Sequence, residues 1–239
     1  MVDESEECIR GGIALYYDEC YPEALHLFNE AIALNPDNAE AWTCRGIAEV
    51  ELLQHTEALS SYDRAIAINP NYIKAWLNRG ALLYHLAQYL KAVESYDKAL
   101  TIDPNYDAEP WFYRGIALFN LGLFDDAVAS YDKALAMLDD KVWEKIYIDT
   151  WKNRESALYE IKHYEVHLDI FNNEITINPN DVEAWKNRGW VLGKLGRFRE
   201  AVNSFDKAIA LNPNDAEAKR KREIALNNKL NLPRSCMHP

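Results

Sequence analysis

Two short blocks decide the fold of this chain because both return along it: Trp76-Leu-Asn-Arg-Gly80 and Ser95-Tyr-Asp-Lys-Ala99. The first recurs as Trp111-Phe-Tyr-Arg-Gly115 and Trp185-Lys-Asn-Arg-Gly189, and the second as Ser130-Tyr-Asp-Lys-Ala134 and Ser204-Phe-Asp-Lys-Ala208. Intervals of 34, 35, 40 and 34 residues separate the tryptophans that mark the copies, Trp42, Trp76, Trp111, Trp151 and Trp185. This period indicates an array of repeats, each of which packs on its neighbours.

The repeated positions resemble the tetratricopeptide repeat, a helix-turn-helix unit. Its pattern is an aromatic residue, a small residue four positions later, Ala and an aromatic residue in the second helix, another Ala, and Pro. The third repeat reads Trp76, Gly80, Ala92, Tyr96, Ala99, Pro104, and the sixth reads Trp185, Gly189, Ala201, Phe205, Ala208, Pro213. The resemblance implies an all-α fold, a right-handed superhelical α-solenoid of helix-turn-helix repeats.

We expect a single array over residues 1–230, because a repeat array has no internal division into globular domains. With each Trp as the fourth residue, the repeats span 5–38, 39–72, 73–106, 108–141, 148–181 and 182–215, and a capping helix follows at 216–230. Two helices in each repeat plus the cap predict thirteen helices. Asn-Pro or Asp-Pro pairs end most repeats, since the residue before Pro avoids the helical region. The tail at 231–239 has two Pro and no apolar periodicity, which predicts disorder.

Composition limits the partners. The chain has 26 Lys and Arg against 38 Asp and Glu, a formal net charge of −12, which argues against nucleic acid or an anionic membrane as partner. The acidic start lacks a signal-peptide pattern, and no stretch approaches the roughly 20 apolar residues that span a bilayer. We therefore expect a cytoplasmic protein. Its four cysteines lack metal-type spacing and are expected to be reduced, although Cys8 and Cys44 fall on adjacent first helices, where a bridge is conceivable.

Charged residues also recur. One offset holds Arg45, Arg79, Arg114, Arg154 and Arg188, and another, in the second helix, holds Asp63, Asp97, Asp132 and Asp206. The recurrence predicts a ladder of structural ion pairs. The sequence leaves open whether the pairs form within a repeat or between neighbours.

The fifth repeat departs from the pattern. Residues 142–147 are an insertion with apolar residues at helical spacing, so its first helix is expected to begin near Asp140. Glu155 takes the Gly offset, and His167 and Glu174 take the two Ala offsets. These larger side chains predict a looser hairpin, in which the two helices pack less closely. The three groups are expected to converge at the contact between the helices, and His163 lies one turn from His167. Such residue types suit a transition metal, and the alternatives are a hydrogen-bonded cluster or a spread, partly hydrated repeat.

The concave face of the first helices is the predicted binding groove, because the resemblance implies a groove that binds peptides there. Its first part is aromatic and apolar, and its last part polar and cationic: Ile13, Tyr16, Tyr17, Ile47, Leu77, Asn78, Tyr84, Phe112, Phe119, Asn120, then Lys152, Lys186, Asn187 and Trp190. A family subset grips a peptide carboxylate with a five-residue clamp, of which Lys152, Asn187 and Lys221 match while Ser156 and Glu217 do not. A peptide terminus or acidic motif near Lys152 and Lys186 is therefore a hypothesis.

These observations predict a non-enzymatic scaffold that binds a protein or peptide in its concave groove, as a monomer or weak homo-oligomer. No catalytic residue, metal or cofactor is predicted. Two alternatives stay open. One is metal binding or a metal-dependent activity at Glu155, His163, His167 and Glu174. The other is self-assembly through the first repeat, where Cys8 replaces Trp beside the apolar Ile9 and Ile13.

Overall fold

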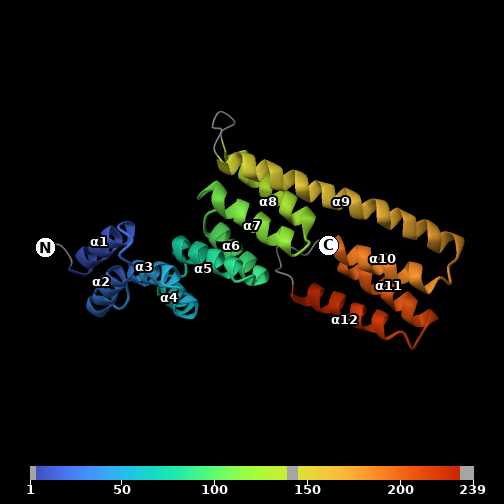
Figure 1. The fold of residues 1–239 in the computed structure, drawn as a ribbon, viewed down its shortest axis with the longest axis horizontal. Helices are drawn as coiled ribbons and strands as arrows, with labels where there is room; N and C mark the ends of the chain where they lie inside the picture. Colours follow the sequence, from blue (N-terminus) through green and yellow to red (C-terminus); the bar gives the residue numbers. More distant parts are fainter. Residues whose placement is uncertain (1–3, 139–144, 232–239) are drawn as a thin grey trace. The chain divides into compact units, whose positions relative to one another are not determined.

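The computed structural model describes residues 4–138 and 145–231, which form an all-α repeat solenoid (Figure 1). Over these residues it has twelve helices and no strand. The chain divides into an N-terminal part, Met1–Pro110, and a C-terminal part, Trp111–Pro239, which are described separately. One array over residues 1–230 stays a prediction. The predicted tail beyond Asn231 and the predicted helix start near Asp140 lie outside the described residues.

The N-terminal part holds the first three repeats as helical hairpins. Its helices are α1 (Glu4–Tyr17), α2 (Tyr21–Leu34), α3 (Ala39–Glu51), α4 (His55–Ile68), α5 (Ile73–His85) and α6 (Tyr89–Ile102). Each helix packs on the next along the chain. The cysteines here, Cys8, Cys20 and Cys44, are free thiols, so the bridge considered between Cys8 and Cys44 is not formed.

The C-terminal part holds one hairpin, a long helix, a second hairpin and a final helix. The elements are α7 (Ala108–Asn120), α8 (Phe124–Met137), α9 (Lys145–Ile177), α10 (Val182–Lys194), α11 (Phe198–Leu211) and α12 (Ala216–Asn231). The long helix α9 lies along both α8 and α10 (Figure 1). The last helix, α12, packs on α11 and occupies the place expected for the cap.

The hairpins close because a glycine on the first helix meets an aromatic ring on the second. A Cβ atom added at Gly46 or Gly115 would lie 2.6 or 2.5 Å from a ring carbon of Tyr62 or Tyr131. Such distances are shorter than real Cβ contacts, so any side chain at these positions would force the ring to shift. The alanines of the second helices, such as Ala58 and Ala92, are fully buried. Close approach of the two backbones therefore depends on small residues at fixed offsets.

The fifth repeat does not form a hairpin. The thirteen-helix prediction is wrong here, because both predicted helices of this repeat belong to the single 33-residue helix α9. Glu155 stands where the other first helices carry Gly, and His167 where the second helices carry Ala. In the other repeats a ring of the second helix fills the space at the glycine, so we infer that larger side chains at these offsets disfavour a hairpin. Without that packing, the helix continues through Lys162, where the other repeats turn.

The residue at the turn position does not by itself explain why the fifth repeat is one helix and the other repeats are hairpins. At the offset of Lys162 the other repeats have Gly122 and Gly196, with φ of +75° and +69°, but also Leu53 and Ala87, with φ of 60° and 55°. Repeats two and three thus turn without glycine and accept a strained backbone. Packing of the small residues offsets that strain.

The repeated arginines pair between repeats, which settles the question that the sequence leaves open. Arg79 Nε donates to Asp63 Oδ1 of the preceding repeat at 2.8 Å. Arg154 and Arg222 make the same bond to Asp132 and Asp206. Before Arg45 the acceptor offset holds Asn29, and Arg45 binds Glu49 on its own helix at 2.8 Å. The pairs therefore join neighbouring repeats.

Each half of α9 makes a hydrogen bond of this kind to a neighbouring repeat. Its first half supplies Arg154 to Asp132 on α8. Its second half supplies Asn172, whose Oδ1 accepts a hydrogen bond of 2.8 Å from Arg188 Nε on α10. The fused helix thus contacts the fourth repeat as a first helix would, and the sixth repeat as a second helix would.

Candidate functional site

A hollow of about 210 Å³ in the N-terminal part gathers several of the predicted groove residues. We call it the N-terminal hollow; its lining includes Ile13, Tyr16, Tyr17, Thr43, Cys44, Ile47, Tyr72, Lys74 and Asn78. Most of the side chains come from the first helices α1, α3 and α5; Tyr72, which precedes α5, and Phe28 on α2 complete the lining. Five of the predicted groove residues, Ile13, Tyr16, Tyr17, Ile47 and Asn78, thus lie together.

The chemistry of the N-terminal hollow suits contact better than catalysis. Burial raises the pKa of Cys44 to about 12, so its thiol stays protonated and is a poor nucleophile at neutral pH. Tyr16 donates a hydrogen bond to Glu51 Oε1 at 3.1 Å, and burial with this bond raises its pKa to about 12. The hollow therefore presents mainly neutral phenol and apolar groups, beside one carboxylate, Glu40, and one ammonium group, Lys74.

A larger pocket of about 640 Å³ lies in the C-terminal part. We call it the C-terminal pocket. Six helices, α7 to α12, and the turn between α7 and α8 line it; among its residues are Phe119, Asn120, Gly122, Phe124, Glu160, Tyr164, Trp190, Gly193, Lys194, Phe198, Arg220, Lys221 and Ile224. Its volume lies within the range of about 300–1,000 Å³ that is usual for ligand sites.

The C-terminal pocket is lined by the unbroken helix α9 and by a glycine of α10, Gly193. The turn of the fourth repeat meets that of the sixth: a Cβ on Gly196 would lie 3.0 Å from Leu123 Cδ2. Gly193 stands at the offset where the first helices α3, α5 and α7 carry Val50, Tyr84 and Phe119. A Cβ added at Gly193 would meet no atom within 4 Å. This absent side chain is a sequence signal that the groove prediction missed.

Aromatic rings form one wall of the C-terminal pocket. Phe119 meets Phe124 edge to face at 5.3 Å between ring centroids, and Phe124 stacks on Tyr164 at 6.1 Å. Tyr164 in turn meets Trp190 edge to face at 6.1 Å. Burial, and secondarily Glu160, raises the pKa of Tyr164, so its hydroxyl remains a hydrogen-bond donor. Such a wall offers contact area at low cost in side-chain entropy.

The lining of the C-terminal pocket is cationic in an acidic chain. Three cations, Lys194, Arg220 and Lys221, line it with one carboxylate, Glu160. Lys194 lies over the Trp190 ring at 5.7 Å from its centroid, and Lys221 pairs with Glu217 at 2.8 Å. The positive lining favours a ligand that carries carboxylates.

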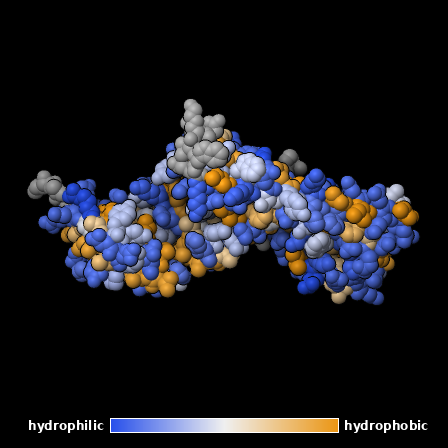
Figure 2. All heavy atoms as spheres, turned by 45° about the horizontal axis from the view of Figure 1, so that its top comes forward, coloured by the Kyte–Doolittle hydropathy of each residue, from blue (hydrophilic) through white to orange (hydrophobic). Residues whose placement is uncertain are grey.

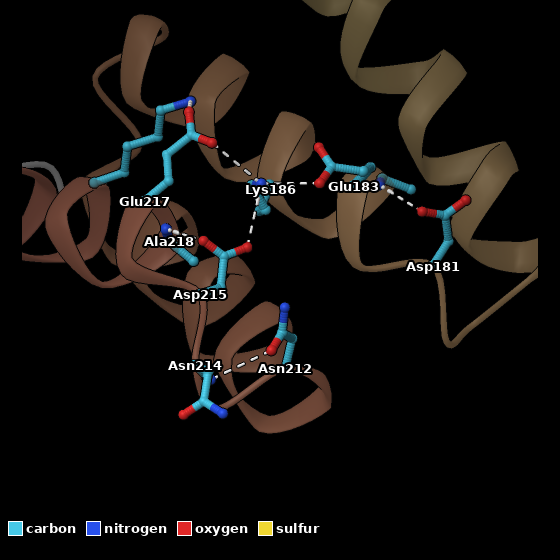
Figure 3. Close-up of polar contacts among 10 residues, drawn as sticks. Asp181, Glu183, Lys186, Asn212, Asn214, Asp215, Glu217 and Ala218 are labelled. Atoms are coloured by element: carbon cyan, nitrogen blue, oxygen red, sulfur yellow. Dashed lines mark hydrogen bonds and ion pairs between the residues drawn. The ribbon is translucent and has the colours of Figure 1, made fainter.

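Lys186 forms ion pairs within the fold, whereas the sequence predicted it in the groove as a cation near a peptide carboxylate. Its side chain is buried, and its Nζ lies 2.9 Å from Glu183, 3.2 Å from Asp215 and 3.2 Å from Glu217 (Figure 3). Glu183 lies on α10, Glu217 lies on α12, and Asp215 immediately precedes α12. Lys186 therefore links the sixth repeat to the cap helix. The geometry argues against Lys186 as the cation that receives a peptide carboxylate.

The Lys186 cluster predicts a pH dependence of stability. A hydrogen bond from the Ala218 backbone, followed by Lys186, lowers the pKa of Asp215; Lys221 and then Lys186 lower that of Glu217. Lowered folded pKa values stabilise the fold above the unfolded values near 4, and this contribution is lost as the pH falls. Lys186→Met should therefore lower the free energy of unfolding at pH 7, with a gap to wild type that narrows by about pH 3.

Urea unfolding at both pH values measures this gap. Lys207→Met is the matched control, because it removes the same charge from an exposed position on α11. An equal loss at pH 7 and pH 3 would contradict the assignment.

The proposed convergence of Glu155, His167 and Glu174 is wrong. Glu155 and His167 lie twelve residues apart on one continuous helix, about 18 Å along its axis. His163 and His167 do lie together, with ring centroids 4.6 Å apart, on an exposed turn of α9. Within residues 4–138 and 145–231, no group of three or more His, Cys, Asp or Glu side chains is placed to hold a metal ion.

The remaining predicted groove residues divide between core and surface. Phe112 is buried, with its ring 6.4 Å from that of Tyr131, so it packs in the core and does not line a groove. Phe119, Asn120 and Trp190 line the C-terminal pocket. Four others line neither the hollow nor the pocket, and their binding role stays a prediction: Leu77, Tyr84, Lys152 and Asn187.

Fold and surface together define an α-helical repeat solenoid with two concave sites. Tetratricopeptide repeat models match residues 9–73, 73–106, 108–140 and 182–215. The chain belongs to the tetratricopeptide repeat family. These matches stop at residue 140 and resume at 182, on either side of α9. A comparison with curated proteins gave no significant match.

Solved structures support the same fold. A chain of the APC/C hetero-tetramer Cut9–Hcn1 is similar at 21% identity and a TM-score of 0.56, over 94% of this chain but only 43% of that one. MamA from Desulfovibrio magneticus RS-1 is similar at 16% identity and a TM-score of 0.51, over 90% and 99% of the two chains. TTC0263, a tetratricopeptide repeat protein of Thermus thermophilus, is similar at 20% identity and a TM-score of 0.50, over 93% and 99%.

Family and fold support a scaffold for protein interaction. Figure 2 shows patches of hydrophobic side chains on a mainly hydrophilic surface. Of the helices that the structure describes, none has the length and apolar character needed to cross a bilayer.

Proposed function

We propose that this chain is a non-enzymatic scaffold that binds a peptide segment of a partner protein, with the C-terminal pocket as the main contact. The observation that carries the proposal is the pocket itself, with an aromatic wall, an open space at Gly193 and three cations against one carboxylate. Neither the pocket nor the N-terminal hollow pairs a nucleophile with a base, which favours binding over catalysis.

The pocket chemistry suggests the ligand. A large apolar side chain would fill the space beside Gly193 and contact Tyr164 and Trp190. Carboxylates next to that side chain would face Lys194 and Arg220. We therefore propose a segment in which an aromatic or aliphatic residue is flanked by Asp or Glu. The N-terminal hollow, with Tyr16 and Ile47, is proposed as a second, apolar contact.

Filling the pocket should abolish this binding and leave the fold intact. Gly193→Trp places a large ring in the empty space, whereas Gly193→Ala adds only a methyl group. Random peptides displayed on phage and selected on the wild type should be enriched in apolar residues flanked by carboxylates. We expect these peptides to lose at least about tenfold in affinity for Gly193→Trp, a cost of about 1.4 kcal/mol, and to bind Gly193→Ala nearly unchanged.

The charge requirement has its own control. Lys194→Ala with Arg220→Ala should weaken the same peptides most at low salt, since screening removes the difference. Far-UV circular dichroism checks that each variant stays helical. Selected peptides that bind Gly193→Trp as tightly as the wild type, or that are basic, would overturn the proposal.

A further inference from the structure

An exposed apolar stripe runs along α9, and nothing in the described chain covers it. Tyr159, Val166, Ile170 and Ile177 are 69%, 53%, 46% and 85% exposed. At about 100° per residue these side chains lie within about 20° of one line along the helix. We call this line the seam. The buried residues of α9, Thr150, Ala157 and Leu168, lie about 160–180° away, so the seam is opposite the packed face.

The fold does not require these apolar residues. At the offset of Val166 the second, third, fourth and sixth repeats carry Glu57, Lys91, Asp126 and Glu200. At the offset of Ile170 they carry Ser61, Ser95, Ser130 and Ser204. Ser95 and Ser204 accept hydrogen bonds from Arg79 and Arg188. Only the fifth repeat replaces both polar residues with aliphatic ones, and it exposes them. Exposed apolar residues of this kind mark an interaction surface.

The spacing of the seam identifies the partner. Its residues are separated by seven, four and seven positions, an order that reads the same in both directions. Two copies of α9 that run antiparallel about a two-fold axis near Leu168 would set Tyr159 against Ile177 and Val166 against Ile170, each pair twice. A two-fold interface needs such self-complementarity, whereas a different partner does not.

The charges beside the seam favour the same orientation. Lys162 lies beside its first half, whereas Asp169 and Glu174 lie beside its second half. Antiparallel pairing sets Lys162 of one helix level with Glu174 of the other, whereas parallel pairing in register would set each charge level with its own copy. In the antiparallel register Glu174 also lies within one residue of the position opposite His163.

We propose that a second copy of this chain docks on the seam, so that two molecules associate through antiparallel α9 helices. This surface differs from the first repeat considered at the outset, where Ile9 is buried against Ala31 and Ala41. One helix pair, about 27 Å long between Tyr159 and Ile177, is a small interface. The association should therefore depend on concentration.

Sedimentation velocity over about a hundredfold range of concentration tests this proposal. The wild type should rise from the monomer mass towards twice that mass and no further. Val166→Glu with Ile170→Ser restores the residue types of the other repeats and should keep the monomer mass throughout. Leu34→Glu, which charges an equally exposed apolar position on α2, should associate as the wild type does. A wild type that stays monomeric overturns the proposal and leaves the seam to a different protein.

Cross-linking tests the register. With Cys8, Cys20, Cys44 and Cys236 replaced by Ala, Tyr159→Cys with Ile177→Cys should form disulfide-linked dimers under mild oxidation, because each new thiol faces the other in the partner. Either substitution alone leaves the thiols of two copies about 27 Å apart and should not cross-link. Cross-linking by the single variants would show a parallel or shifted pairing and overturn the proposed register. Peptide binding in the C-terminal pocket should be unchanged by Val166→Glu with Ile170→Ser.

Discussion

Restoring small residues to the fifth repeat should split α9 into two helices. The change is Glu155→Gly, His167→Ala and Glu174→Ala, with Lys162→Gly at the turn. In the wild type Lys152 and Asn173 lie on one helix, about 32 Å apart along its axis. In a hairpin they would lie on facing helices, whose axes are about 8–10 Å apart. Spin labels at these two positions should therefore report a distance that falls by more than half.

Controls separate packing from turn chemistry. Lys162→Gly alone should cost about 1 kcal/mol of helix stability but keep the long distance, since the side chains that block the hairpin remain. The variant with all four substitutions should also lose the contact between Gly196 and Leu123, and with it the C-terminal pocket. An unchanged long distance in the four-fold variant would show that the small residues do not decide the hairpin.

The same substitution at two helical glycines should have opposite effects. At Gly115 a Cβ would lie 2.5 Å from the ring of Tyr131, which is buried, so Gly115→Ala should lower the free energy of unfolding by about 1–2 kcal/mol after its gain in helix propensity. Gly115→Leu should cost more than about 3 kcal/mol. At Gly193 no atom lies within 4 Å, and Gly193→Ala should raise stability by up to about 1 kcal/mol.

Urea unfolding followed by circular dichroism measures both sites. Because repeats can unfold in steps, the slope of each transition is compared along with its midpoint. Gly189→Ala serves as a second test, since its Cβ would meet Phe205 at 2.8 Å and should behave like Gly115→Ala. Destabilisation at Gly193 equal to that at Gly115 would contradict the argument.

The repeats were predictable from sequence because each physical requirement recurs. Trp76 and Gly80 mark the first helix, and Tyr96 fills the space that Gly80 leaves. Such pairs predict the hairpin wherever they return. The prediction of the family and of the all-α repeat fold is confirmed on these residues.

The continuous helix α9 was harder to predict, because large residues at the small offsets are compatible with a looser hairpin as well as with one helix. Glu155, His167 and Glu174 were recognised as too large for the hairpin, and a looser hairpin was expected. The fifth repeat could form a loosely packed hairpin or one continuous helix. The outcome depends on the difference in free energy between these two states, which the residue at a single offset does not indicate. Leu53 and Ala87 show that a missing turn glycine is not decisive.

The candidate site was predictable only in part. The repeat offsets indicate which residues lie on one surface, but they do not indicate which side chains of other helices contact them. Ile13, Tyr16 and Ile47 do share the N-terminal hollow. The ion pairs of Lys186 with Asp215, just before the cap helix, and with Glu217, on it, could not be predicted, because the offsets do not indicate which charged groups of different helices meet. The role of Gly193 could not be predicted from its offset, because this residue contributes empty space and no side chain.

The bonds between repeats have a consequence for how such chains change length. Arg79, Arg154 and Arg222 each reach back to an aspartate of the preceding repeat, so these junctions are chemically alike. Removal or duplication of a whole repeat would therefore recreate the same bond at the new junction. Interchangeable junctions allow an array to gain or lose repeats during evolution with no compensating mutation at the join.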